Sequence, residues 1–168
     1  YKNQEVVLKE SGIHDIESRN RFLKESSFLC SLKHPSIAEI ESIFIQSNQF
    51  PTLGYIVMPR YENGDLQEFV QKNKVEIDIL KRLFRESLEG IAYLHQSGMI
   101  HSDVKPENIF VSSDLHARIG DFDVSKNLKE RLSKISATLK QTRIGFTIEY
   151  AAPEFFENEP SISTKSDI

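Results

Sequence analysis

Short apolar runs with many branched side chains alternate with polar segments in the N-terminal part of the chain. Three such runs, over residues 4–9, 37–45 and 52–58, predict β-strands. A polar turn and Phe50–Pro51 separate the last two runs, as expected for a surface connection. These residues are therefore predicted to form a small β-sheet.

One segment between the first two predicted strands has helical spacing instead. Within residues 18–33, one face of the expected helix carries Phe22, Glu25, Leu29 and Leu32. A glutamate in an apolar stripe either lies at its edge and reaches water or faces inward and requires a cationic partner. The pattern leaves both arrangements open for Glu25.

A second helix is predicted over residues 76–97, with Gly98 as its stop. Its wide apolar face indicates a core helix and consists of Leu80, Leu83, Phe84, Leu88, Ile91 and Leu94. Short apolar runs at 109–111 and 117–119 then predict two further strands, with a polar turn between them.

Composition places few restrictions on function. The 168 residues suit one domain, and 39% hydrophobic with 27% charged residues is typical of globular proteins. A net charge of −4 gives no basic field for nucleic acid, and Cys30, the only cysteine, excludes an internal disulfide. No apolar run approaches the ~20 residues of a membrane span. We therefore expect an intracellular protein, cytoplasmic or nuclear.

The segment HSDVKPENIF, from His101 to Phe110, concentrates chemically useful side chains. Asp103 could accept a proton from a hydroxyl, and Lys105 could balance charge on a phosphate. Asn108 could offer its side-chain oxygen to a hard cation such as Mg²⁺. The alternative is a solvated polar turn, which is improbable for the whole string.

HSDVKPEN resembles the catalytic loop of eukaryotic protein kinases, in which His-Arg-Asp is followed, after four residues, by Asn. The sequence Lys-Pro-Glu-Asn in this segment is similar to that of the serine/threonine branch of the family. The chain is accordingly identified as a member of this family, with Asp103, Lys105 and Asn108 in the catalytic positions. Ser102 departs from the pattern because the family usually has Arg there.

The resemblance extends to an ATP site. VVLK, ending at Lys9, resembles the strand whose Lys contacts the ATP phosphates, and Glu25 matches its ion-pair partner. PRYENGDL resembles the hinge that binds adenine. The cofactor-binding residues implied in this way are Val7, Lys9, Glu25, Met58, Pro59, Tyr61, Asp65 and Phe110.

The segment GDFD, residues 120–123, resembles the family's Asp-Phe-Gly, so that Asp121 would hold Mg²⁺ together with Asn108. Asp123 replaces the family's Gly and could alter switching between active and inactive forms. Residues 121–154 then match the activation segment, which ends at Ala152–Pro153–Glu154. Asp167 resembles the residue that braces the catalytic loop.

The implied fold is α+β, a partial two-lobed kinase fold. Residues 1–58 would form an N-lobe without the glycine-rich loop, 59–64 the hinge, and 65–168 an incomplete, mainly helical C-lobe. We expect a fragment of a longer protein, poorly soluble or inactive by itself.

The implied function is transfer of the γ-phosphate of ATP to Ser or Thr of protein substrates, with Mg²⁺ as cofactor. A pseudokinase that binds nucleotide or partner proteins remains the alternative, since Ser102 and Asp123 depart from the pattern. A small-molecule kinase of similar fold is disfavoured.

Overall fold

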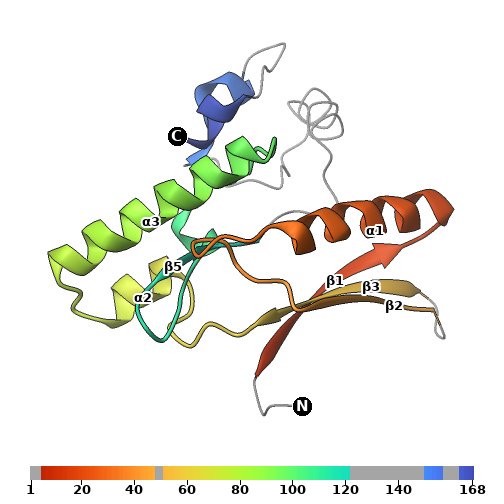
Figure 1. Ribbon diagram of the computed structural model, residues 1–168, viewed down its shortest axis with the longest axis horizontal. Helices are drawn as coiled ribbons and strands as arrows, with labels where there is room; N and C mark the ends of the chain where they lie inside the picture. The colour runs from red at the N-terminus through yellow and green to blue at the C-terminus, as the bar shows by residue number, and fades with distance from the viewer. Residues whose placement is uncertain (1–4, 48–50, 122–149, 157–162) are drawn as a thin grey trace.

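A computed structural model describes residues 5–47, 51–121, 150–156 and 163–168. The described chain forms a sheet with one helix on its face, followed by a mainly helical part (Figure 1). This arrangement agrees with the predicted α+β, two-lobed fold. We call the two parts the sheet lobe and the helical lobe.

The sheet lobe contains three antiparallel strands in the order β1-β3-β2. They are β1 (Val6–Ile13), β2 (Ser42–Gln46) and β3 (Thr52–Pro59). The prediction of a strand over 37–45 was wrong in its first half. Residues 36–38 pair with the helical lobe instead, through hydrogen bonds from Ala38 N to Ile119 O (2.7 Å) and from Ile119 N to Ser36 O (2.8 Å). The apolar residues there therefore fill the contact between the lobes.

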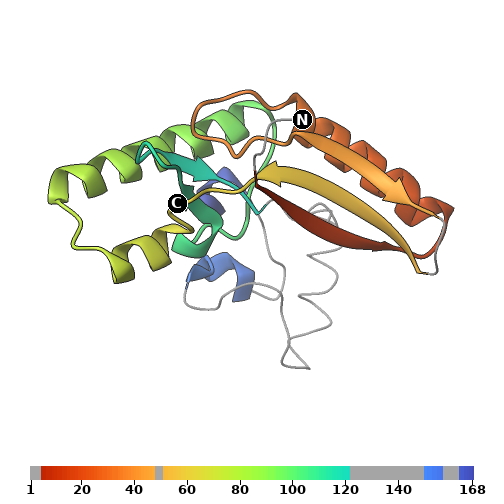
Figure 2. The same ribbon diagram turned by 90° about the horizontal axis from the view of Figure 1, so that it is seen from below.

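Helix α1 (Ile16–Ser31) covers one face of this sheet (Figures 1 and 2). It begins two residues before the predicted start because Asp15 and Ser18 form a reciprocal capping box. A Cβ on Gly54 of β3 would lie 2.7 Å from the Phe22 ring, so the helix packs closely on the central strand.

The helical lobe contains α2 (Leu66–Lys72) and the long helix α3 (Ile77–Gln96). The predicted apolar face of α3 was too wide. Leu83, Ile91 and Leu94 are buried, whereas Phe84 and Leu88 are exposed within the described structure. Gly98 has a φ of 76°, a conformation that suits glycine and ends the helix as predicted.

After α3 the chain forms a loop, the short 3₁₀ helix η1 (Pro106–Asn108) and a β-hairpin. The hairpin pairs β4 (Ile109–Val111) with β5 (Ala117–Ile119), as the sequence predicted. Two further 3₁₀ turns, η3 (Pro153–Phe156) and η4 (Thr164–Asp167), lie near the C-terminal end. Among the described residues, no helix has the length and apolar character needed to cross a lipid bilayer.

Candidate active site

The loop between α3 and β4 brings together the three residues that the sequence singled out. The side-chain amide of Asn108 donates from Nδ2 to the Asp103 carbonyl (2.7 Å) and to its carboxylate oxygen Oδ2 (3.1 Å). Lys105 Nζ lies 3.3 Å from the same Oδ2. The Asp103 carboxylate is thereby fixed between an amide and a cation, as suits a group that must meet a hydroxyl at a set distance.

Asp167 holds the start of this loop, as predicted. Its fully buried carboxylate accepts hydrogen bonds from the backbone N–H groups of His101 (2.8 Å) and Ser102 (2.6 Å) and lies 2.8 Å from His95 Nε2. Ser102 has a φ of 64°, which is unusual for a residue other than glycine. The two N–H bonds to Asp167 stabilise this backbone conformation.

The loop is also tied to the end of β5. His101 Nε2 lies 2.9 Å from the carbonyl of Gly120, and Gly120 N donates to the Asn108 carbonyl at 2.9 Å. His101 is buried and bonded to the main chain, which supports a structural role for it. These contacts place Asp121, the next residue, beside Asn108.

Lys9 reaches this site from the sheet lobe. Its ammonium lies 2.6 Å from Asp121 Oδ1. The sequence had also predicted a pair of Lys9 with Glu25, and that pair stays a prediction. Glu25 faces inward, since its Oε2 atom is buried. Asp121 has a φ of 54°, which is uncommon for a residue other than glycine.

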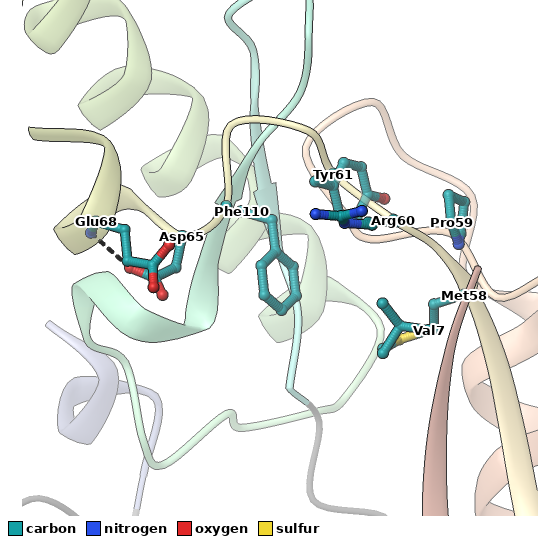
Figure 3. Close-up of a pocket in the computed structure, with 9 residues that line it drawn as sticks. Val7, Met58, Pro59, Arg60, Tyr61, Asp65, Glu68 and Phe110 are labelled. Carbon is teal, nitrogen blue, oxygen red and sulfur yellow. Dashed lines mark hydrogen bonds between the residues drawn. The ribbon is translucent and has the colours of Figure 1, made fainter. Parts of the chain in front are cut away.

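A pocket of about 220 Å³ opens where the two lobes join (Figure 3). Six of the eight predicted cofactor-binding residues line it: Val7, Met58, Pro59, Tyr61, Asp65 and Phe110. The other two, Lys9 and Glu25, are not part of its lining. Arg60, Gly64 and Glu68 also line the pocket and had not been predicted. Arg60 and Gly64 lie within PRYENGDL, so including every residue of that segment would have found them.

Aromatic rings form one wall of the pocket. The rings of Tyr61 and Phe110 are stacked, with centroids 5.5 Å apart and planes inclined by 9°. The Tyr61 hydroxyl accepts a hydrogen bond from Glu39 N (3.2 Å), and burial raises the pKa of this phenol. A planar apolar surface facing Val7 suits a flat heterocycle.

Asp65 has a structural role as well as a place in the pocket. Its Oδ1 accepts a hydrogen bond from Glu68 N (2.8 Å) and so caps the N-terminus of α2. The prediction that Asp65 reaches a ribose stays a prediction. The two residues just before Asp65 are hydrogen-bonded to the β4–β5 hairpin. Asn63 donates from Nδ2 to the Ser112 carbonyl (2.7 Å), and the Gly64 carbonyl accepts a hydrogen bond from Val111 N (2.9 Å).

The donors around Asp121 fit a magnesium ion that also binds phosphate. Both hydrogen bonds from Asn108 to Asp103 are donated by its side-chain nitrogen, and neither involves its side-chain oxygen. Hard oxygen donors suit Mg²⁺, which commonly takes only one or two carboxylates and completes its shell with water and phosphate. The described residues hold no cluster of three or more His, Cys, Asp or Glu side chains that could bind a metal without such help.

Part of the predicted activation segment, residues 122–149 with Asp123, lies outside the described residues. Glu154 is described, and one of its carboxylate oxygens accepts a hydrogen bond from Ser166 Oγ, which lowers the pKa of Glu154.

Comparison with known proteins agrees with this geometry. The protein kinase domain family matches residues 1–168. The chain is 33% identical over 158 residues to serine/threonine-protein kinase cds1 of Schizosaccharomyces pombe, an alignment that covers 94% of this chain and 32% of that protein. It is 29% identical over 168 residues to human receptor-interacting serine/threonine-protein kinase 1, covering 94% of this chain and 24% of the relative.

A bifunctional serine/threonine-protein kinase/NEDD4-like E3 ubiquitin-protein ligase of Dictyostelium discoideum is 31% identical over 176 residues, covering 100% of this chain and 9% of the relative. The chain thus spans about a third or less of the length of these relatives. The match over every residue, together with the contacts that join Lys9, Asp103, Asn108 and Asp121, shows that this chain belongs to the eukaryotic protein kinase family.

Proposed function

We propose that the domain transfers the γ-phosphate of ATP to serine or threonine hydroxyls of protein substrates. The observation that carries the proposal is the placement of four side chains at one site. Lys9 pairs with Asp121, the neighbouring Gly120 is hydrogen-bonded to Asn108, and Asn108 is hydrogen-bonded to Asp103. A phosphoryl transfer needs a cation on the phosphates, oxygen ligands for Mg²⁺ and a carboxylate at the nucleophile. These four side chains supply all of them within one site.

Each residue has a distinct task in this proposal. The adenine would enter the pocket between Val7 and Phe110, and Lys9 would hold phosphate oxygens. Asn108 and Asp121 would hold Mg²⁺, which supplies charge neutralisation on the phosphates when bound. Asp103 would orient the substrate hydroxyl and accept its proton, and Lys105 would offset charge on the transferred group.

The preference for Ser and Thr, the protein substrates and the intracellular location are parts of the same proposal. The preference rests on Lys105 and on the names of the relatives.

The test is phosphate transfer to a generic Ser/Thr substrate by the full-length protein and by its Asp103→Asn variant. A catalytic carboxylate of this kind contributes about 10²–10⁴-fold, so the variant should lose at least ~100-fold in kcat and still bind ADP. Asp78→Asn, on the exposed first turn of α3, is the matched control and should retain activity. Equal rates for Asp103→Asn and the parent protein would overturn the proposal.

A nucleotide-binding pseudokinase is the second candidate. Ser102 favours it, because the position that usually carries Arg holds a small buried residue. That candidate predicts ADP binding without any transfer above background in the parent protein.

A further inference from the structure

The two proposed metal ligands flank the β4–β5 hairpin. Asn108 lies immediately before β4, and Asp121 follows β5 after one residue. Each strand of the hairpin has only three paired residues. The relative position of the ligands therefore depends on whatever fixes the closed end of this short hairpin, since small shifts there are transmitted along a stiff, close-packed element.

Glu86 of α3 is the main contact of that closed end. Its Oε2 accepts a hydrogen bond from Ala117 N at 2.8 Å, and its Oε1 lies 2.7 Å from His116 Nδ1. The Glu86 side chain is only 15% exposed, so both carboxylate oxygens are committed to the hairpin in a partly dehydrated place. Charge-assisted bonds to a backbone N–H are among the stronger hydrogen bonds in proteins.

Arg82, one helical turn earlier, contacts the same closed end. Its Nη2 donates to the carbonyl of Leu115 at 3.0 Å. Leu115 has a φ of 62°, a left-handed conformation that is unfavourable for a residue with a branched apolar side chain. The turn itself adds a bond from Leu115 N to Ser112 O (2.9 Å). Arg82 and Glu86 therefore hold consecutive residues of a turn that contains an unfavourable backbone conformation.

We propose that Arg82 and Glu86 are positioning residues for the magnesium–nucleotide site, acting through the hairpin on Asn108 and Asp121. The inference rests on the proposed function, because it assigns the metal to these two ligands. Neither α3 residue touches the pocket or the catalytic loop in the contacts of the described chain. Phe110 of the same hairpin lines the pocket, but Asn108 and Asp121 adjoin both of its strands, so we expect metal affinity to change more than adenine binding.

The experiment measures Mn²⁺ binding to the full-length protein by electron paramagnetic resonance, with ADP present, and ADP binding without metal by calorimetry. Glu86→Leu should weaken Mn²⁺ binding about tenfold, the usual lower size of an outer-shell effect. It should change metal-free ADP affinity less than about twofold. Glu86→Gln, which keeps an acceptor for Ala117 N, should recover most of the loss. Glu89→Leu, on the exposed side of α3, is the matched control and should behave as the parent.

A second pair of variants covers the case in which Glu86→Leu does not fold. Arg82→Met should weaken Mn²⁺ binding, and adding Leu115→Gly should restore it, because glycine adopts the positive φ without strain. Hydrogen exchange at Ala117 N should accelerate in Glu86→Leu and not in Glu89→Leu.

The outcomes separate this inference from the proposed function. Parent protein that holds no Mn²⁺ in the presence of ADP overturns both. Parent protein that binds Mn²⁺ and ADP, with Glu86→Leu and Arg82→Met showing the parent's Mn²⁺ affinity, overturns only the positioning role. An equal loss of metal-free ADP and Mn²⁺ affinity also overturns it, because that result indicates general loss of structure.

Discussion

The ammonium of Lys9 lies 2.6 Å from the carboxylate of Asp121, although 112 positions separate the two residues in the chain. The pair joins the sheet lobe to the end of the hairpin in the helical lobe. Both side chains are partly exposed, at 29% and 48%. An ion pair with this exposure adds little stability, typically about 0–1 kcal/mol. We therefore expect the ion pair to matter chiefly for function, because it places side by side two groups that, in the proposed function, act on magnesium and phosphate.

Replacing Lys9 with Met tests this assignment. The free energy of unfolding should fall by less than about 1 kcal/mol, because the lost pair is solvent-screened. Phosphate transfer should fall at least ~100-fold, since the preorganised cation that would hold the ATP phosphates is lost. Steady-state kinetics and chemical denaturation measure the two effects. Lys81→Met, which breaks an exposed pair with Asp78 on α3, is the control and should change neither.

The contact between Gly120 and Phe110 gives a second prediction. A Cβ at Gly120 would lie 2.5 Å from Phe110 Cε2 and 3.1 Å from the Cβ of Ala38. Gly120→Ala should therefore push the Phe110 ring into the pocket, lower stability by about 1–3 kcal/mol and weaken ADP binding. Isothermal titration calorimetry measures the affinity.

The matched test is the double variant Gly120→Ala/Phe110→Leu, in which the smaller side chain makes room for the new methyl group. Because Phe110→Leu also removes an aromatic ring from the pocket, its own loss is measured separately, and the double variant should bind ADP more tightly than the sum of the two losses predicts. Additive losses in the double variant would show that the two residues do not compete for space.

Tyr61 gives a prediction about alkaline pH. Burial raises the pKa of Tyr61 above its ordinary value of 10.0. The unfolded chain therefore releases the phenolic proton at a lower pH than the folded chain does. As a result, the contribution of this proton to the free energy of unfolding is complete below pH 10.0 and is lost as pH rises through the pKa of the folded state. The Tyr61→Phe variant should not show this fall in the free energy of unfolding at alkaline pH.

The same variant should be less stable near neutrality. It removes the acceptor for Glu39 N, which should cost about 0.5–1.5 kcal/mol at pH 7. The stability difference between parent and variant should shrink above pH 10, as measured by urea unfolding across pH. A difference that stays constant to pH 11.5 would contradict the assignment.

Much of the fold could be predicted from local pattern. The spacing of Leu83, Ile91 and Leu94 predicted α3, and Gly98 predicted its end, because both signals are local. The strand prediction over 37–45 was wrong because Ile37 pairs with Ile119, a contact distant in sequence. Helix α2, which had not been singled out, is only seven residues long and depends on its Asp65 cap.

The site could be predicted mainly by its resemblance to a family. Motif positions identified six residues of the pocket lining, and the contacts of Asp167 with the catalytic loop are those expected. The direct ion pair of Lys9 with Asp121 had not been predicted, because no local pattern fixes which atoms of two residues 112 positions apart come into contact. Neither had the hairpin contacts of Glu86, since no sequence pattern links α3 to the turn before Ala117.

Ser102 leads to a prediction about regulation. The family's usual Arg at this position supplies a cation for a phosphate on the activation segment, and Ser102 supplies none. Treating the full-length protein with phosphatase should therefore lower its kinase activity less than about threefold, since no charge-assisted contact at this position is lost. Mass spectrometry would verify that the phosphates are gone. An activity loss of tenfold or more would contradict the prediction.

Asp167 provides the sharpest test of how the catalytic loop is held. Its buried carboxylate accepts the N–H groups of both His101 and Ser102, and removing it leaves two buried donors without acceptors. Each such donor costs about 1–3 kcal/mol, so Asp167→Leu should lose roughly 2–6 kcal/mol of stability. Asp167→Asn keeps one side-chain oxygen and should lose about half as much. Because the positive φ of Ser102 depends on the same bonds, kcat should fall in both variants while the KM for ATP changes little. Thermal unfolding and kinetics measure these effects, and an unchanged kcat in a folded Asp167→Asn variant would show that the loop keeps its conformation without Asp167.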